Sequence, residues 1–260
     1  MSQHLYTFHQ LISHLGHGVI GSCFCDGDDF APTPDAAAEA LALLPPIERA
    51  LVAHAVPSRQ WEFARTRLLA HELLSTLGYP RGELLRDEQR APLWPAGVCG
   101  TLTHTHGFQG ALVATTDRVL TLGLDAERAQ PLFPDVLESI ASPGERQHLS
   151  QQAVHLPLDT VLFSAKEALY KAWYPVTGAW LGFEDAELKL IVDSVTSEAS
   201  KTTTHLSGSG RFSARVEEQL LALYADISPQ CSEFAECSGV WVVDKGLIVT
   251  ALVIPTPHVD

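Results

Sequence analysis

Three carboxylates and two lysines at fixed spacing are the residues of this sequence best suited to chemistry. Asp125 and Glu127 stand two apart in GLDAE, and FSAKEALYKAW holds Lys166, Glu167 and Lys171. Side chains two apart project from the same face of a strand, and side chains four apart share a helix face. Adjacent carboxylates repel each other unless one is protonated or a cation lies between them. The spacing therefore predicts an oxygen-ligand site for a hard ion such as Mg²⁺.

Both motifs also have a simpler interpretation. Short Asp-x-Glu patterns occur in ordinary turns, and Glu167 with Lys171 could form a solvated ion pair on a surface helix. The rest of the chain has to decide between a site and a surface.

A histidine in a predicted strand is a third feature with chemical potential. His104 follows Thr103 in GTLTHTHGFQGALVA. A buried imidazole bonded to backbone and an imidazole that donates to a phosphate both fit this position, and His106 is the weaker candidate for the second role.

Basic residues are sparse and clustered. The 260-residue chain has a formal net charge of −14 and only 17 Lys and Arg. Arg59 and Arg67 lie in SRQWEFARTRLLAHELLSTL, and Arg86 and Arg90 lie in the polar segment after it. The acidic balance argues against a nucleic-acid partner, which requires a basic field. Local arginines instead suit a small anionic ligand.

The elements that would position these residues alternate between helices and strands. Helices are predicted over 35–55, with a break at Pro45-Pro46, and over 58–77, with Ser58 as N-cap. Strands are predicted within 100–127 and from 186 onward, with a hairpin turn at 244–246 and a flexible Ser/Thr-rich loop over 194–210. This order predicts an α+β fold of two similar halves, 1–120 and 121–260, with each half made of helix plus antiparallel strands.

The compartment can also be inferred. The N-terminus has no charged-then-apolar signal pattern, and no apolar run approaches the ~18 residues of a spanning helix. The five cysteines are odd in number and form no zinc pattern. We expect reduced thiols, a cytoplasmic protein and no membrane partner.

The motifs together resemble the 4′-phosphopantetheinyl transferases of the surfactin/enterobactin type. Family members carry G-[IVL]-D-x-E followed by [FW]-[SCT]-x-K-E-[AS]-x-x-K, and both motifs are complete here. RAPLWPAGVCGTLTH also resembles the P-x-W-P-x-G-x-x-G-S-[IL]-[ST]-H block of the family. The chain is most similar to the actinobacterial branch, from about residue 45 onward.

The resemblance implies roles for individual residues. It implies that Asp125, Glu127 and Glu167 bind magnesium (or manganese), with Glu167 also the catalytic base. The residues implied to contact coenzyme A are Arg59, Arg67, Arg86, Arg90, Thr103, His104, Asp125, Lys166 and Lys171. Tyr170, Trp180 and Leu181 are candidates for the pantetheine arm or the carrier-docking surface, with plain core as the alternative. The chain departs from the family at Thr66, often Gly, and at His71, often Arg.

The resemblance also implies the reaction and its partners. Coenzyme A would donate 4′-phosphopantetheine to a serine of an apo carrier domain, with adenosine 3′,5′-bisphosphate as the second product. The carriers would belong to polyketide synthases, peptide synthetases or fatty acid synthase. The implied fold has two pseudo-symmetric halves with the site between them, so one chain would suffice and a monomer is expected. A Mg²⁺-dependent phosphohydrolase and an inactive carrier-binding homologue are the alternatives.

Overall fold

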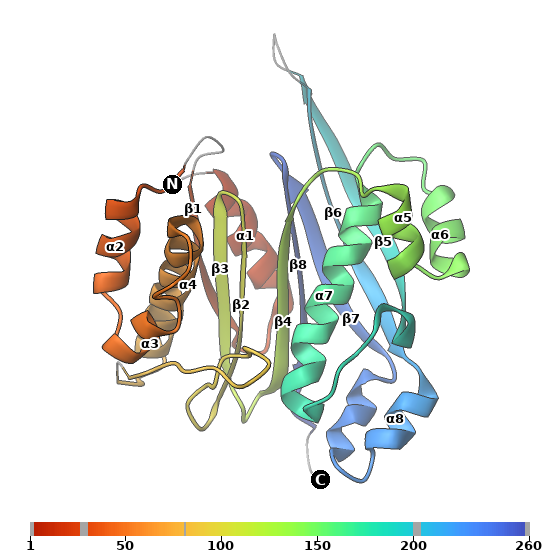
Figure 1. Cartoon of the computed structure of the whole chain (residues 1–260). Helices are drawn as coiled ribbons and strands as arrows, with labels where there is room; N and C mark the ends of the chain where they lie inside the picture. Colours follow the sequence, from red (N-terminus) through yellow and green to blue (C-terminus); the bar gives the residue numbers. More distant parts are fainter. Residues whose placement is uncertain (1–2, 27–30, 81, 200–203, 258–260) are drawn as a thin grey trace.

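Helices pack on two antiparallel sheets in the computed structural model, which describes residues 3–26, 31–80, 82–199 and 204–257 (Figure 1). The α+β fold expected from the sequence is thereby confirmed. The division at residue 120 and the internal duplication stay predictions.

The first sheet has the order β1-β3-β2 and is covered by a long helix. Its strands are β1 (Ile20–Cys25), β2 (Val98–Thr105) and β3 (Phe108–Thr115). Helix α4 (Pro57–Thr76) packs on β3 and β1, and α2 (Pro34–Ala42) packs on α4, beside the short α3 (Pro46–Ala50). The N-cap of α4 is Val56, so the Ser58 prediction is wrong. Pro57 takes the first helical position, where its fixed φ and missing N–H cost nothing.

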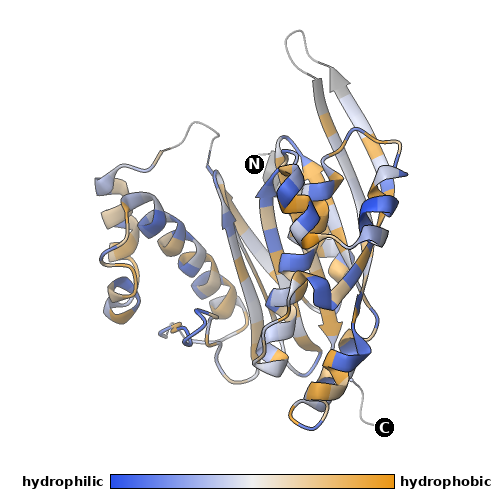
Figure 2. Ribbon diagram, turned by 45° about the vertical axis from the view of Figure 1, so that its right-hand side comes forward, coloured by the Kyte–Doolittle hydropathy of each residue, from blue (hydrophilic) through white to orange (hydrophobic). Residues whose placement is uncertain are grey.

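The second sheet has the order β4-β8-β7-β6-β5. Its strands are β4 (Val119–Arg128), β5 (Ala186–Ala199), β6 (Thr204–Val216), β7 (Cys237–Asp244) and β8 (Leu247–Pro255). Helix α7 (Leu158–Thr177) lies on β4 and β8, and apolar residues colour both this helix and the strands beneath it (Figure 2). The other elements here are α5 (Pro134–Ile140), α6 (Pro143–Ser150), α8 (Glu218–Tyr224) and the 3₁₀ turns η1 (Phe183–Asp185) and η2 (Pro229–Phe234).

The flexible loop predicted over 194–210 is wrong for the described residues, because β5 and β6 continue as a paired ladder up to residue 199 and from residue 204. Side-chain hydrogen bonds also link these strands, although residues 193–197 are exposed. The hydroxyls of Ser194 and Ser209 lie 2.8 Å apart across the pair, and Ser207 donates to Asp244 at 3.0 Å. Such cross-strand hydroxyl pairs stabilise a sheet. Residues 200–203 lie outside the described part.

The first helix spans both halves. Helix α1 (Gln3–Leu15) contacts β1 of the first sheet and β7 and β8 of the second. Phe8, Leu11 and Leu15 are buried there, in a core shared by strands of both sheets. No structure is predicted for this segment from the sequence. In the fold it is a helix that packs against strands of both sheets.

Two further findings concern the whole of the described chain. Its helices include none that is both long and apolar enough to cross a membrane. All five cysteines are free thiols.

Candidate active site

A close approach of β4 and α7 brings the acidic motifs together. A Cβ at Gly123 would lie 2.0 Å from the carbonyl oxygen of Ala168, so only glycine allows this contact. Two residues further along β4, Asp125 accepts a hydrogen bond from Ser164 of α7 at 2.9 Å. Ser164 is fully buried, so it faces the sheet and lies apart from the solvated side of its helix.

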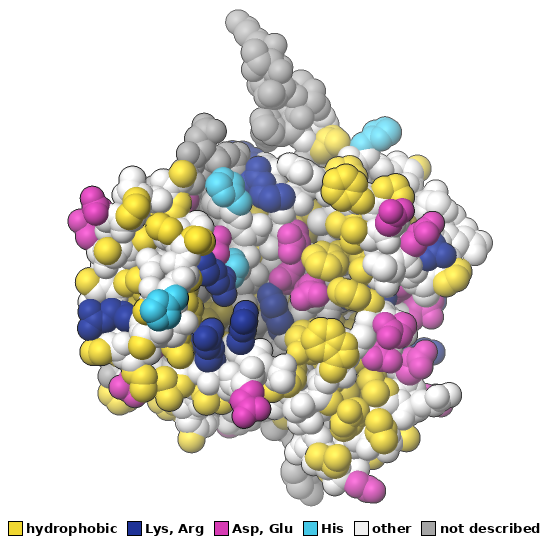
Figure 3. Space-filling view, viewed as in Figure 1, with side chains coloured by type: hydrophobic (Ala, Val, Ile, Leu, Met, Phe, Trp, Pro, Cys, Tyr) yellow, Lys and Arg dark blue, Asp and Glu magenta, His cyan; other side chains and the backbone are white. Residues whose placement is uncertain are grey.

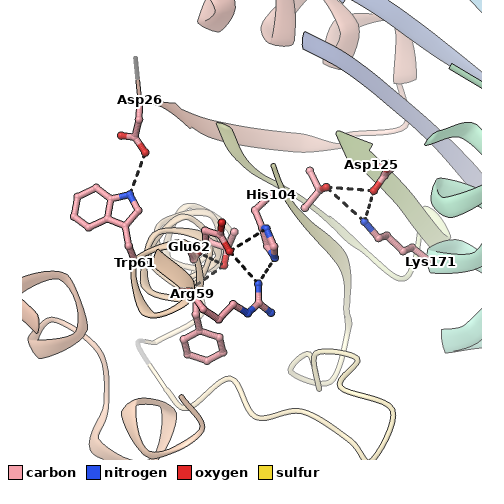
Figure 4. Close-up of polar contacts among 10 residues, drawn as sticks. Asp26, Arg59, Trp61, Glu62, His104, Asp125 and Lys171 are labelled. Atoms are coloured by element: carbon pink, nitrogen blue, oxygen red, sulfur yellow. Dashed lines mark hydrogen bonds and ion pairs between the residues drawn. The ribbon is translucent and has the colours of Figure 1, made fainter. Parts of the chain in front are cut away.

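Asp125 is the centre of a hydrogen-bond network. Lys171 Nζ lies 2.7 Å from its Oδ1, and Thr103 Oγ1 donates to the same oxygen at 3.5 Å (Figure 4). Lys171 also donates to the carbonyl of Leu124 at 3.1 Å. Asp125 is 5% exposed. Its charge is therefore balanced inside the protein, and Thr103 and Lys171 meet at it from opposite halves.

Glu127 and Glu167 carry the charge that is not balanced. Burial, and then the Asp125 carboxylate, raises the pKa of Glu127 to about 7. Burial and Asp125, in the same order, also raise the pKa of Glu167, while Lys171 opposes both shifts. Like charges that raise each other's pKa values mark a place where a cation would be stabilising.

The acids fit a hard divalent ion by donor type and by charge. Asp125, Glu127 and Glu167 all offer carboxylate oxygens, the ligand atoms that Mg²⁺ prefers. The charges of Glu127 and Glu167 are not fully balanced by a nearby cation of the described chain. Among the described residues no group of three acidic, histidine or cysteine side chains is already arranged around a metal position. Lys171 instead neutralises Asp125, so an incoming ion would share that carboxylate with the ammonium.

An arginine-lined cavity of about 280 Å³ opens beside the acids. Its walls come from α4, β2, the segment before β2, and α7. Of the residues implied by the resemblance it includes Arg59, Arg67, Arg86, Arg90, His104, Glu167, Tyr170 and Lys171. On the molecular face in Figure 3, Lys and Arg side chains gather beside acidic ones around the central hollow.

Arg67 is the buried cation of this cavity. It is 3% exposed, and its Nη1 has no hydrogen-bond partner. Burial lowers the pKa of Arg67 to about 10, with Arg86 adding to the shift and Glu48 opposing it. The guanidinium thus stays charged at neutral pH with an unsatisfied donor, which is costly unless an anion binds.

His104 forms a second cluster with α4. Its Nδ1 lies 3.4 Å from Glu62 Oε2, and its Nε2 is bonded to Arg59 Nη1 (Figure 4). Glu62 also pairs with Arg59 at 3.4 Å. Burial first and Arg59 second lower the pKa of His104, which leaves the imidazole neutral. His104 is therefore satisfied by side chains of α4, an outcome between the two alternatives left open by the sequence.

Lys166 does not join these cations. Its ammonium is 3% exposed and donates to Glu145 at 2.9 Å and to the carbonyls of Phe183 and Ala186 at 2.7 and 3.0 Å. All three hydrogens are used on the opposite side of α7 from Asp125. These bonds argue against a contact between Lys166 and a coenzyme A phosphate, which stays a prediction. Lys166 and Glu167 nevertheless both line a second, smaller cavity.

A smaller cavity of about 110 Å³ adjoins Glu167. Tyr170, Trp180 and Leu181 line it, and the Tyr170 and Trp180 rings lie 4.9 Å apart. Trp180 is 71% exposed, so plain core is excluded for it, whereas Leu181 is 6% exposed. The cavity is small and its wall combines the aromatic Tyr170, Trp180 and Phe183 with apolar and charged side chains, a lining that suits a small ligand group.

Three other residues of α4 and its surroundings show what the sequence could and could not predict. Arg65 faces β1, where its guanidinium lies 3.3 Å from the Phe24 ring centroid and 3.8 Å from Asp26. His71 is buried against Glu48 at 2.9 Å, outside the cavity. Glu62 was not predicted, although its place three residues after Arg59 is the spacing of a helical ion pair.

The comparisons with known proteins agree with this geometry. Residues 47–114 match the family model of the 4′-phosphopantetheinyl transferase N-terminal domain, and residues 121–223 match that of the 4′-phosphopantetheinyl transferase superfamily. The chain is 40% identical to the 4′-phosphopantetheinyl transferase Svp of Streptomyces mobaraensis, over 88% of this chain and 84% of that protein.

Two further relatives give the same result. The chain is 36% identical to the 4′-phosphopantetheinyl transferase PptT of Mycobacterium tuberculosis, over 80% of this chain and 85% of that protein. It is 35% identical to the transferase Npt of Nocardia iowensis, over 80% and 87%. The two family models match residues on both sides of the cavity, and the relatives match most of the length of this chain. The chain therefore belongs to the 4′-phosphopantetheinyl transferase superfamily.

Proposed function

We propose that the arginine-lined cavity binds coenzyme A for transfer of its 4′-phosphopantetheine group to a carrier serine. The observation that carries the proposal is Arg67, a buried charged guanidinium with an unpartnered donor in a protein of net charge −14. Burial without a partner is costly, so the position demands an anionic ligand. Arg59, Arg86 and Arg90 line the same cavity and would meet the remaining phosphate charge.

The acids beside the cavity supply the chemistry. Magnesium (or manganese), held by Asp125, Glu127 and Glu167, would stabilise negative charge on the pyrophosphate. The carrier serine oxygen forms a bond to the phosphorus of the pantetheine phosphate. The bond from that phosphorus to the oxygen of the departing adenosine 3′,5′-bisphosphate breaks.

Glu167 takes the proton of the serine hydroxyl. Burial and the neighbouring Asp125 raise the pKa of Glu167, and a raised pKa makes a carboxylate a better base near neutral pH. Lys171 pairs with Asp125 at 2.7 Å and lines the cavity as well. His104 lines the cavity on the side of β2, whereas Thr103 is buried and donates to Asp125.

The aromatic cavity at Tyr170, Trp180 and Leu181 lies on the other side of Glu167 and would receive the pantetheine arm. The acceptors we propose are apo carrier domains of polyketide synthases, peptide synthetases or fatty acid synthase. We place the reaction in the cytoplasm, where the five free thiols stay reduced.

The test is incubation with coenzyme A, Mg²⁺ and a panel of apo carrier domains, read by intact-protein mass spectrometry. A carrier should gain one 4′-phosphopantetheine group, with one adenosine 3′,5′-bisphosphate released per group. Release of the nucleotide without a carrier would indicate a phosphohydrolase instead. Binding of carriers without transfer at any metal concentration would indicate an inactive homologue.

A further inference from the structure

The segment 84–93 forms one wall of the arginine-lined cavity and is anchored at its base to the first half. The Leu84 amide donates to buried Glu48 at 2.9 Å, and Arg86 Nη2 donates to the carbonyl of Leu51 at 3.3 Å. The Leu93 amide donates to the Leu85 carbonyl at 3.0 Å, which closes the segment into a loop. We call residues 84–93 the arginine loop, because it carries Arg86 and Arg90.

The tip of the arginine loop is organised by Asp87. Its Oδ1 accepts from the Ala91 amide at 2.8 Å, and its backbone N–H donates to the Ala91 carbonyl at 3.0 Å. Arg90 donates its amide to the Asp87 carbonyl and has a φ of 70°, a conformation rare for a residue with a side chain. The local bonds therefore hold Arg90 in a defined and unusual orientation at the cavity wall.

The second oxygen of Asp87 is used across the cleft. Tyr174 Oη, on α7 of the second half, donates to Asp87 Oδ2 at 2.8 Å. Tyr174 and Pro175 of α7 line the cavity, and Gln89 and Arg90 of the loop line it as well. The hydrogen bond thus joins the two halves at the cavity itself. One carboxylate fixes both the turn that carries Arg90 and the distance of that turn from α7.

We propose that Tyr174 and Asp87 are positioning residues: their hydrogen bond latches the arginine loop over the cavity and slows the release of the anionic ligand. The proposal rests on the function proposed above for its ligand, coenzyme A. The loop base is anchored to Glu48 and Leu51, so without the latch only the tip can move. Tip movement would withdraw Arg90 from the phosphates, while Arg86 stays at the anchored base and Arg59 and Arg67 stay on helix α4.

The test is Tyr174→Phe, which removes the donor and keeps the ring. The KM for coenzyme A and its dissociation rate should rise about three- to tenfold, as for loss of one hydrogen bond of ordinary net strength, with kcat within about twofold. In the free protein, hydrogen exchange at the Ala91 amide of the tip should quicken by a similar factor, whereas exchange at the Leu93 amide of the anchored base should not change. Tyr79→Phe is the matched control, because its hydroxyl donates to Ala96 within the first half.

Asp87→Asn is the second variant, because asparagine still offers Ala91 an acceptor. Its effect should not add to that of Tyr174→Phe in a double-mutant cycle. Wild-type KM, dissociation rate and Ala91 exchange in Tyr174→Phe, or fully additive effects, would overturn the latch. Failure of the wild-type protein to bind coenzyme A would overturn the proposed function instead, and exchange at Ala91, measured without ligand, would still decide whether Tyr174 holds the loop.

Discussion

Glu127 and Glu167 are placed where their own charge is unfavourable. Both are half-buried beside Asp125, and Lys171 is already committed to Asp125 at 2.7 Å. The two carboxylates therefore hold protons more tightly than free glutamate does. Protons and metal ions compete for such a site.

The first prediction concerns Glu127 and pH. Its pKa is raised to about 7 from the ordinary value of 4.5, so between these two pH values the folded state binds more protons than the unfolded state. The contribution of this group is fully present below the lower value and is lost as pH rises through the higher one. The midpoint of metal-free thermal unfolding should therefore carry a component that falls over this range, and Glu127→Gln should remove that component.

Magnesium should reverse this loss. Because the ion competes with the proton, the rise in unfolding temperature on adding Mg²⁺ should be larger at pH 8 than at pH 5.5. Chelation should abolish the difference. An equal rise at both values, in wild type and in Glu127→Gln alike, would contradict the metal assignment.

The second prediction compares two arginines of one helix. Arg67→Gln should weaken binding of adenosine 3′,5′-bisphosphate by about ten- to a hundredfold, as expected for loss of ~1.5–3 kcal/mol from a charge-assisted contact. Arg65→Gln should leave binding within about twofold, because Arg65 stacks on Phe24 away from the cavity. Isothermal titration calorimetry measures both.

A ligand variant locates the contact further. We propose that Arg59 and Arg67 hold the 3′-phosphate and that His104 positions Arg59 through its bond to the guanidinium. The loss in Arg59→Ala and Arg67→Gln should therefore shrink with 3′-dephospho-coenzyme A. Equal losses for both ligands would assign these residues to the pyrophosphate. An Arg65 variant that binds as weakly as the Arg67 variant would contradict the predicted orientation of the helix.

At the scale of elements, α7 carries different tasks on different faces. Its apolar face packs on the second sheet, Ser164 and Lys171 hold Asp125, and Glu167 and Tyr170 line the cavities. Lys166, between them in sequence, joins α7 to α6 and to the start of β5. Glu145 of α6 extends this network by accepting from the Leu188 amide at 2.8 Å.

The third prediction follows from that network. Lys166→Met leaves Glu145 buried without its cation and should lower the free energy of unfolding by about 3 kcal/mol or more, the cost of breaking a buried pair. Urea denaturation measures this. The double variant Lys166→Met/Glu145→Gln should recover part of the loss, because no charge then stays unpaired.

The same variant tests whether Lys166 contacts a coenzyme A phosphate. The KM for coenzyme A should change little in Lys166→Met at temperatures where the protein is folded. A large loss of coenzyme A affinity with unchanged stability would restore the phosphate contact expected from the motif.

Much of this arrangement is predictable from the sequence, for identifiable reasons. Alternating apolar patterns and turn residues predict β2, β3, β4 and the β7–β8 hairpin. The acidic motifs predict that Asp125, Glu127 and Glu167 interact, as their raised pKa values indicate, and their joint role as metal ligands stays a prediction. These features are local. The partners of Lys166 are not, since Glu145 and Ala186 lie about twenty residues away on either side. The Tyr174–Asp87 contact joins residues 87 apart.

The Ser/Thr-rich ends of β5 and β6 show a different limit. Their composition is typical of a loop, but cross-strand pairing and hydroxyl bonds make them strands. Tertiary pairing outweighs local preference in such segments. Helix α1 was missed for a related reason, since its importance lies in contacts with β7 and β8 at the other end of the chain.

At the scale of the whole molecule, the basic and acidic parts of the site come from one chain. Arg59 and Arg67 lie on α4, Thr103 and His104 on β2, and the acids on β4 and α7. β2 and β4 lie side by side where the two sheets meet (Figure 1). No element of the site needs a second copy to complete it.

The fourth prediction is therefore an active monomer. Turnover per chain should stay constant on dilution to concentrations at which sedimentation shows only monomer. Mixing two inactive variants, Arg67→Gln and Glu167→Gln, should restore no activity, whereas a site shared between subunits would be partly restored. Turnover that falls through a dimer transition would contradict the prediction.

Helix α1 connects the two sheets of the molecule. It fastens both sheets together by burying Phe8 and Leu11 among strands of each, while the Tyr174–Asp87 bond joins the halves at the cavity. The cavity between the halves can therefore widen only if the contacts of α1 or the Tyr174–Asp87 bond are disturbed. This coupling is reciprocal. A ligand that contacts both halves should suppress local unfolding of α1, and a variant that destabilises the packing of α1 should weaken binding of that ligand by the same coupling free energy. The first helix, which bears none of the motifs, is in this sense part of the affinity of the site.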